Sequence, residues 1–144
     1  GSGRVIMPEL SELRRMASLI TDAGVHHLFV RVSKSRIHKL EDLSDFVAQW
    51  MSQGGHNAFT LHGRSRGKEV MVVCTPASPS PSPSAPNQLQ IVFQPGMSGR
   101  FVHASSAQEL PPHSHFMFHG QDDSVLAYVP PLCLFIPLKL FGTL

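Results

Sequence analysis

A proline- and serine-rich run, residues 75–88, constrains this chain more than any other feature. It holds five of the 12 prolines and no charged residue. Such a run cannot bury enough apolar surface to offset the entropy lost on ordering, so we expect a solvated, extended segment. Strand-like patterns lead directly into it (69–75) and directly out of it (88–94). The sequence therefore predicts one domain, residues 4–144, with a long flexible internal loop at 76–87.

The loop separates two parts that differ in charge. The chain has 144 residues, of which 42% are hydrophobic and 15% charged, and its net charge is +2. Residues 1–74 carry ten Lys or Arg and seven Asp or Glu, whereas residues 75–144 carry two and three. A net charge this small does not indicate nonspecific nucleic-acid binding. Any basic surface that contacts nucleic acid must therefore be local and must lie in residues 1–74. The low charge of the second part indicates that a partner covers some of its surface.

Apolar residues recur at helical spacing in two N-terminal segments, residues 8–22 and 39–53. Gly24 follows the first segment and is expected to close it in the left-handed conformation. Alternating or continuous apolar runs predict strands at 25–33, 57–62, 69–75, 88–94, 100–104, 114–119, 125–129 and 132–140. These patterns predict an α+β fold: two N-terminal helices packed on a largely antiparallel or mixed β-sheet, with a strand-rich C-terminal half.

Two basic segments interrupt these elements. One joins a strand to the second helix, and the other forms the tip of a predicted hairpin. If both lie on one rim of the sheet, they form a cationic site that contacts the phosphates of RNA or DNA. The alternative is two separate solvated loops. The candidate contacts are Arg31, Lys34 and Arg36 in the first segment and Arg64, Arg66 and Lys68 in the second.

His113 and His115 form a candidate metal site. On a strand they would share one face, about 6.6 Å apart, close enough for two imidazoles to hold one ion. The segment Leu110-Pro-Pro-His-Ser-His resembles the His-x-His strand of cupin barrels, which implies a bound metal. The chain departs from that family at the position of its glutamate, where residues 117–119 are Met, Phe and His. The alternative is a pair of surface histidines beside a Pro-Pro turn.

No residue pattern indicates covalent catalysis. Cys74 and Cys133 lie in apolar runs, and apolar surroundings raise the pKa of a thiol. The segment Gly63-Arg-Ser-Arg-Gly joins two strands, whereas a nucleophile elbow joins a strand to a helix. Gly67-Lys68 is followed by Glu69, not by the Ser or Thr of a phosphate-binding loop. We therefore predict that the chain is not an enzyme and uses no cofactor.

An apolar run near the C-terminus, residues 132–141, holds a single charge. Either both of its faces are buried within the domain or one face is an interface. Prolines interrupt the apolar stretch 125–138, so no membrane span is expected. The candidate interface residues are Leu132, Leu134, Phe135, Ile136, Leu138 and Phe141.

Taken together, these features lead to three interpretations. The leading one is a non-catalytic protein–protein interaction domain of a larger intracellular protein, cytoplasmic or nuclear, that binds another protein or a second copy of itself. The second is a nucleic-acid-binding module that uses the basic hairpin tip, with RNA as the expected ligand. The third is the cupin-like metal site at His113 and His115.

Overall fold

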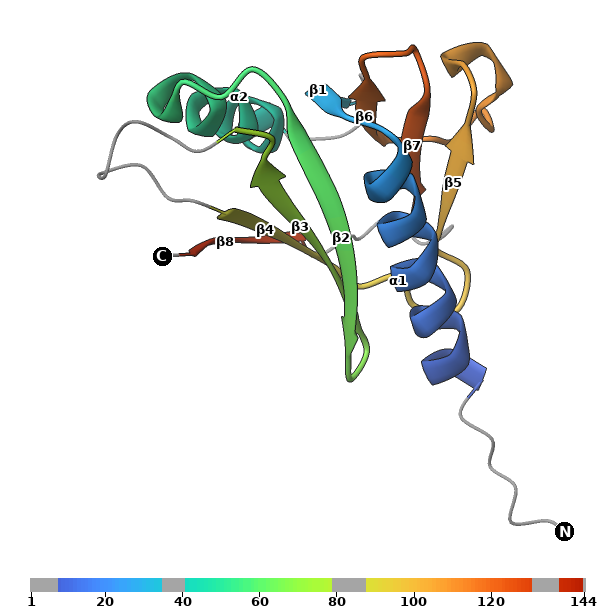
Figure 1. Ribbon diagram of the computed structural model, residues 1–144. Helices are drawn as coiled ribbons and strands as arrows, with labels where there is room; N and C mark the ends of the chain where they lie inside the picture. The colour runs from blue at the N-terminus through green and yellow to red at the C-terminus, as the bar shows by residue number, and fades with distance from the viewer. Residues whose placement is uncertain (1–7, 35–40, 79–87, 131–137, 144) are drawn as a thin grey trace, which may run out of the picture.

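The computed structural model describes residues 8–34, 41–78, 88–130 and 138–143 (Figure 1). Most of the predicted loop 76–87 lies outside these residues, so its flexibility stays a prediction. The described elements are α1 (Pro8–His26), β1 (Phe29–Lys34), α2 (Glu41–Gly54), β2 (Phe59–Arg66), β3 (Glu69–Pro76), β4 (Gln88–Phe93), β5 (Arg100–Ala104), a 3-10 turn (Ala107–Glu109), β6 (Phe116–Gly120), β7 (Val125–Val129) and β8 (Leu138–Thr143).

The described strands pair in one antiparallel series, in the order β5-β7-β6-β1-β2-β3-β4-β8. Most neighbours pair along much of their length; β2 and β3, for example, pair from Phe59↔Pro76 to Arg66↔Glu69. Strands β1 and β2 are the exception, because they meet at Phe29↔Phe59 alone. Hydrogen bonds between strands therefore restrain the geometry of the sheet least between β1 and β2.

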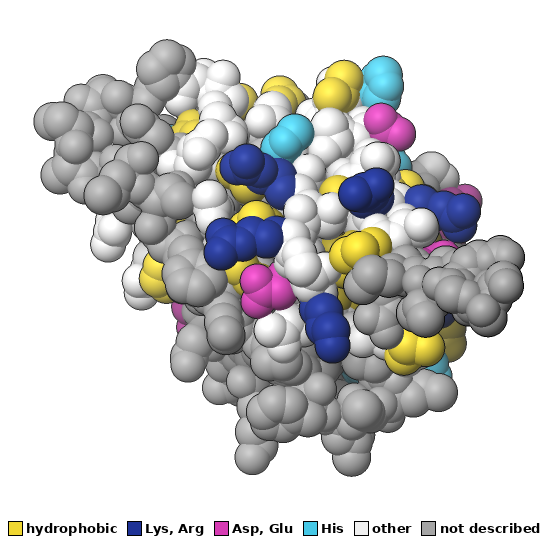
Figure 2. Space-filling model, turned by 90° about the horizontal axis from the view of Figure 1, so that it is seen from below, with side chains coloured by type: hydrophobic (Ala, Val, Ile, Leu, Met, Phe, Trp, Pro, Cys, Tyr) yellow, Lys and Arg dark blue, Asp and Glu magenta, His cyan; other side chains and the backbone are white. Residues whose placement is uncertain are grey.

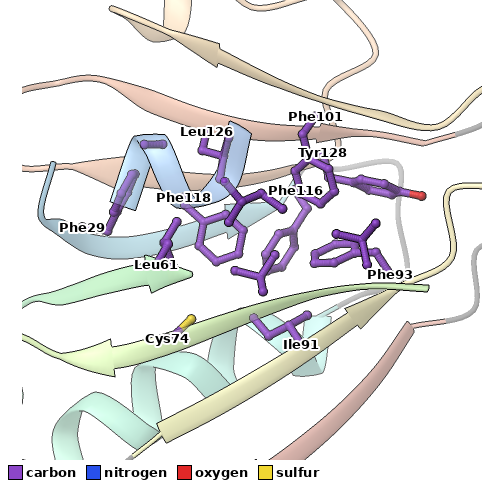
Figure 3. Packing of buried hydrophobic residues seen from close by; sticks show 14 of the residues in the cluster. Phe29, Leu61, Cys74, Ile91, Phe93, Phe101, Phe116, Phe118, Leu126 and Tyr128 are labelled. Atoms are coloured by element: carbon purple, nitrogen blue, oxygen red, sulfur yellow. The ribbon is translucent and has the colours of Figure 1, made fainter. Parts of the chain in front are cut away.

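Aromatic side chains show that the sheet folds over on itself (Figure 3). The ring of Phe93 on β4 lies 5.1 Å from Phe101 on β5, 5.8 Å from Phe116 on β6 and 4.7 Å from Tyr128 on β7. All four side chains are buried. Because β1, β2 and β3 separate β4 from β6 in the series, these contacts require the two halves of the sheet to face each other. The result is a β-sandwich with an aromatic core.

The predicted fold class, two helices packed on a sheet, is therefore wrong. Strands supply both walls of the core, and the helices flank the sandwich: α1 contacts β2, β3 and β5, while α2 packs Trp50 against Phe59 (Figure 1). Apolar alternation identifies a strand but not the surface that its buried face meets, so the sequence did not distinguish a sheet covered by helices from a sheet covered by itself. None of the described helices is long and apolar enough to cross a membrane.

Helix α1 covers the edge of β2 that β1 leaves open. The hydroxyl of Thr21 accepts a hydrogen bond from the N–H of Gly63 (2.9 Å) and donates one to the carbonyl of Ala17 (3.0 Å). A Cβ atom at Gly63 would lie 2.3 Å from the carbonyl oxygen of Ala17, and one at Gly24 would lie 1.7 Å from that of Leu61. The two glycines therefore allow the helix to approach the strand closely enough to satisfy its free edge.

The boundary between α1 and β1 differs from the predicted one. Helix α1 continues through Gly24 to His26, so this glycine is not the closing residue that the spacing predicted. Strand β1 correspondingly begins at Phe29 instead of Val25. Strand β3, whose apolar run is continuous, lies between β2 and β4.

Candidate nucleic-acid interface

The β2–β3 hairpin brings exposed cations to one end of the molecule. Arg66 pairs with Glu69, so Gly67 and Lys68 alone form the turn. Gly67 has a φ of +58° at the first turn position, as a type II′ hairpin turn requires. Arg64, Arg66 and Lys68 are all exposed. The hairpin thus presents three cations on a backbone held in a fixed register.

A second turn, residues 95–99, carries an exposed methionine. The N–H of Gly99 donates to the carbonyl of Pro95 (2.8 Å) and closes the turn, and Gly96 adopts a φ of +64°. Met97 stands 84% exposed at the apex, and the exposed Arg100 follows. The closed turn therefore presents an apolar side chain to solvent next to an exposed arginine.

Strand register places the two turns side by side. Val70, next to the hairpin tip, pairs with Phe93 at the end of β4. The amide of Gln94 then donates to the carboxylate of Glu69 across a distance of 3.1 Å. The turn that carries Met97 therefore begins beside the hairpin tip.

The N-terminal half of α1 extends toward the same end (Figure 1) and carries exposed arginines. Seen from this end, Lys and Arg side chains are spread over the surface with few acidic side chains between them (Figure 2). Arg15 has an exposed ion pair with Glu12 at 3.5 Å. We call this surface the cationic end; its residues are Arg14, Arg15, Arg64, Arg66, Lys68, Met97 and Arg100.

The other predicted basic segment does not join this surface. Strand β1 runs antiparallel to β2 from the pair Phe29↔Phe59, and its later residues lead away from the hairpin tip. Arg66 lies seven residues beyond Phe59 along β2, about 23 Å at about 3.3 Å per residue. Arg31 and Lys34 therefore lie toward the opposite end, and Arg36 lies outside the described residues. The described part of the first basic segment, with Arg31 and Lys34, does not share a rim with the hairpin tip.

The predicted metal pair does not lie on one strand face. Strand β6 begins at Phe116, and the exposed His113 belongs to a turn closed by the N–H of Ser114 on the carbonyl of Pro111 (3.2 Å). The geometry assumed for His113 and His115 therefore does not apply. Within the described ranges, no group of three or more His, Cys, Asp or Glu is arranged to hold a metal ion. Metal binding by this pair stays a prediction.

Cys74 is a buried free thiol, and burial raises its pKa, as predicted for a structural cysteine. Cys133 lies outside the described residues, as do four of the six candidate interface residues: Leu132, Leu134, Phe135 and Ile136. Leu138 and Phe141 belong to β8, which pairs with β4 at the end of the strand series. The predicted interface stays a prediction.

Met97 is not among the residues predicted from the sequence. The available signal was Pro95-Gly96-Met97-Ser98-Gly99, in which a single apolar residue lies among turn-forming residues. That composition predicts an apolar side chain at a turn apex, where no strand or helix can bury it.

Comparison with known proteins defines the class of the chain. Residues 7–132 match the family of the formamidopyrimidine-DNA glycosylase N-terminal domain. The match covers most of the 144 residues, and the chain belongs to this family. Comparison with curated protein sequences gives no match.

Solved structures of the formamidopyrimidine-DNA glycosylase of Lactococcus lactis (Fpg, or MutM) share the fold. The complex with DNA containing an AP site is 14% identical, covers 93% of this chain and has a TM-score of 0.64. The complex with DNA containing Fapy-dG is 14% identical, covers 93% and scores 0.63. The complex with DNA containing an oxidised pyrimidine is 16% identical, covers 94% and scores 0.63. The chain spans only 44%, 44% and 45% of these three glycosylase chains.

The interpretation as a non-catalytic protein interaction domain is therefore wrong, and so is the prediction that the chain lies outside the enzymes. Its family is the N-terminal domain of a DNA-repair glycosylase. The chain of 144 residues carries no compact catalytic motif of the kinds considered, and the glycosylases of this fold are more than twice as long. Cations on turns also leave no diagnostic motif, because any Lys or Arg in reach of a phosphate serves.

Proposed function

We propose that this chain is the DNA-binding N-terminal part of a DNA glycosylase, and that its cationic end receives duplex DNA containing a damaged base. The observation that carries this proposal is the exposed Met97 beside the cations of the β2–β3 hairpin. Membership of the glycosylase family supports DNA in place of the RNA expected from the sequence. The same membership supports the predicted intracellular location.

The cations of the hairpin suit a phosphate backbone. Arg64 and Arg66 are two residues apart on β2, so both project from the same face of the strand. Lys68 extends the row into the turn. Each phosphate that such a side chain neutralises releases condensed counterions, which favours binding at low salt without regard to base sequence. These contacts position the DNA, and a different side chain must detect the damaged base.

Met97 has the properties of a side chain that probes the base stack. Enzymes that act on a base extrude it from the duplex, which leaves a gap in the stack. Apolar side chains, methionine among them, insert between base steps and compensate for lost stacking. Met97 is unbranched, 84% exposed and flanked by Gly96 and Ser98, which leave the backbone room to approach the DNA. We assign it the role of a wedge.

The substrate class follows from the relatives. Their complexes contain an AP site, Fapy-dG or an oxidised pyrimidine in DNA. We propose duplex DNA with a ring-opened, oxidised or missing base as the ligand of the cationic end, and release of the damaged base as the activity of the complete glycosylase. Within the complete glycosylase, this chain binds DNA and fills the gap that the extruded base leaves in the stack.

A binding experiment tests the proposal. The 144-residue chain is titrated with a duplex that contains one tetrahydrofuran abasic-site analogue and with the matched intact duplex, at one ionic strength. We expect tighter binding of the duplex with the gap, and a loss of about tenfold in that preference in Met97→Ala, because the wedge offsets part of an unstacking cost of about a few kcal/mol per step. Val25→Ala, an exposed apolar position at the far end of α1, is the control and should change nothing. Equal affinity for both duplexes in the parent chain would overturn the proposal.

A further inference from the structure

Four polar side chains from three segments meet at the end of the sandwich opposite the cationic end. His27 follows α1, His103 lies on β5, and Asp122 and Ser124 belong to the turn between β6 and β7. The Nδ1 atom of His27 lies 2.6 Å from Oδ2 of Asp122, and the Ser124 hydroxyl donates to Oδ1 of Asp122 (2.7 Å). The imidazole rings of His27 and His103 lie 4.8 Å apart, edge to face. We call these four residues the histidine cluster.

Helix α1 separates this cluster from the DNA-binding surface. The helix begins near the cationic end and reaches the cluster at its C-terminus (Figure 1). From Arg15 to His27 the chain advances 12 residues, about 18 Å at about 1.5 Å per residue. The cluster is therefore not an extension of the DNA-binding surface.

Asp122 fixes the orientation and tautomer of His27. An aspartate carboxylate only accepts hydrogen bonds, and Oδ2 of Asp122 lies 2.6 Å from Nδ1 of His27, so Nδ1 of His27 carries the proton. In the neutral ring the lone pair is then on Nε2. A carboxylate on the far nitrogen is what surrounds metal-bound histidines, because it orients the ring and raises its basicity.

His103 supplies a second imidazole with no competing bond. Its Nε2 atom is buried and has no hydrogen-bond partner. A buried polar atom without a partner costs free energy that a bound ligand would remove. Two imidazoles whose ring centroids lie 4.8 Å apart thus bring two nitrogen ligands close together.

We propose that His27 and His103 bind one late first-row divalent cation, such as Zn²⁺, Ni²⁺ or Cu²⁺, with Asp122 as the partner that orients His27. Imidazole nitrogens suit these ions, whereas Mg²⁺ and Ca²⁺ require oxygen ligands. The site has two protein ligands, His27 and His103. Water completes the coordination, so the ion is exchangeable. The terminal torsion of an imidazole has a broad minimum, which allows His103 to turn a nitrogen toward the ion.

The bound ion would join two parts of the fold, the end of α1 and strand β5. Among the described strands, β5 ends the series and pairs with β7 alone. A metal bridge from His103 would tie this strand to His27 at the end of α1. Because the unfolded chain cannot hold both ligands in place, the ion stabilises the folded state in proportion to its occupancy.

The experiment uses the 144-residue chain without a polyhistidine tag, treated with chelator and dialysed. Ni²⁺, Zn²⁺ and Mg²⁺ are added in calorimetry and in thermal unfolding. We expect Ni²⁺ and Zn²⁺ to bind and raise Tm, and Mg²⁺ to do neither. His103→Gln should lose at least tenfold in affinity and Asp122→Asn about tenfold. His62→Gln, which alters an exposed histidine on β2, is the matched control and should bind like the parent.

A spectroscopic measurement separates ligand loss from unfolding. Electron paramagnetic resonance of the Cu²⁺ complex should show two imidazole nitrogens in the parent chain and one in His103→Gln, with circular dichroism unchanged between them. Undiminished Ni²⁺ affinity in His103→Gln would overturn the proposal, and so would the absence of Ni²⁺ or Zn²⁺ binding to the parent chain. Neither result depends on DNA binding, so the two proposals fail independently.

Discussion

The two ends of the sandwich use their polar side chains in opposite ways. At the cationic end the side chains of the hairpin project into solvent, and Met97 stands beside them 84% exposed. In the histidine cluster at the other end, His27, Asp122 and Ser124 are linked by hydrogen bonds, and the ring of His103 packs against that of His27. Both ends depend on α1, which lies along β2 between them. The cationic end suits a large polyanion, and the histidine cluster suits a small ion.

The difference reflects how each end is built. A tight hairpin and a closed turn hold their backbones by themselves, so their side chains remain available to a partner. The cluster joins segments far apart in the sequence, such as His27 and Asp122, and needs its side-chain contacts to hold them. Mutations should therefore affect binding at the first end and stability at the second.

The largest effect is expected at the contact between α1 and β2, on which both ends depend. Gly63→Ala places a Cβ atom 2.3 Å from the carbonyl of Ala17 and forces α1 away from β2. We expect a loss of about 3 kcal/mol in the free energy of unfolding. Ser18→Ala, on the exposed side of the same helix, should stay within about 0.5 kcal/mol. Denaturant unfolding measures both, and equal stability of the two variants would contradict the packing of α1 on β2.

The next effect concerns only the cationic end. Arg64→Ala combined with Arg66→Ala removes two phosphate contacts, so affinity for duplex DNA should fall about tenfold or more at low salt. The slope of log affinity against log salt should become shallower by about 1.8, since each contact contributes about 0.9. Arg31→Ala, on β1 toward the other end, should leave both quantities unchanged. An unchanged slope in the double variant would remove the hairpin from the interface.

A smaller effect follows from moving Met97 without deleting it. Gly99→Ala puts a Cβ atom 2.5 Å from the carbonyl of Pro95 and disturbs the bond that closes the turn. We expect a loss of about 1–2 kcal/mol in stability, and a severalfold loss of preference for the duplex with a gap. Ser98→Ala, exposed in the same turn, is the control. If Gly99→Ala keeps the full preference, the closed turn does not position Met97.

The smallest effect is a pH dependence that involves the histidine cluster. Burial lowers the pKa of His56, His103 and His119 from the usual 6.5. Below about pH 6.5 the unfolded chain therefore binds more protons than the folded chain, so stability falls as the pH falls. Each group contributes at most about 1.4 kcal/mol per pH unit. Urea unfolding between about pH 7 and pH 5 should show a shallower slope for His103→Gln than for His113→Gln. Stability that rises on acidification would contradict these shifts.

The sequence predicted the elements of this fold better than their arrangement. The apolar periodicity around Trp50 marked α2 within two residues, and the continuous apolar run of β3 marked a central strand. Periodicity reports only which side chains are buried. It could not show that Phe93 meets Tyr128 across the core, because that contact depends on a bend between two strands.

The same limit applies to the sites. The hairpin cations were predictable because their turn is local, encoded by Gly67 and Lys68. His27 and Asp122 are 95 residues apart, and nothing in either neighbourhood predicts their contact. The prediction that His113 and His115 share a strand face fails because the strand begins only at Phe116, after the turn that follows the two prolines.

Hydrogen–deuterium exchange with and without the abasic-analogue duplex tests most directly the claim that DNA binds at the cationic end. We predict slower exchange on DNA binding in residues 64–68 and 96–100, and no change in residues 121–124 beside the histidine cluster. Protection of residues 121–124 with none at the hairpin would contradict it.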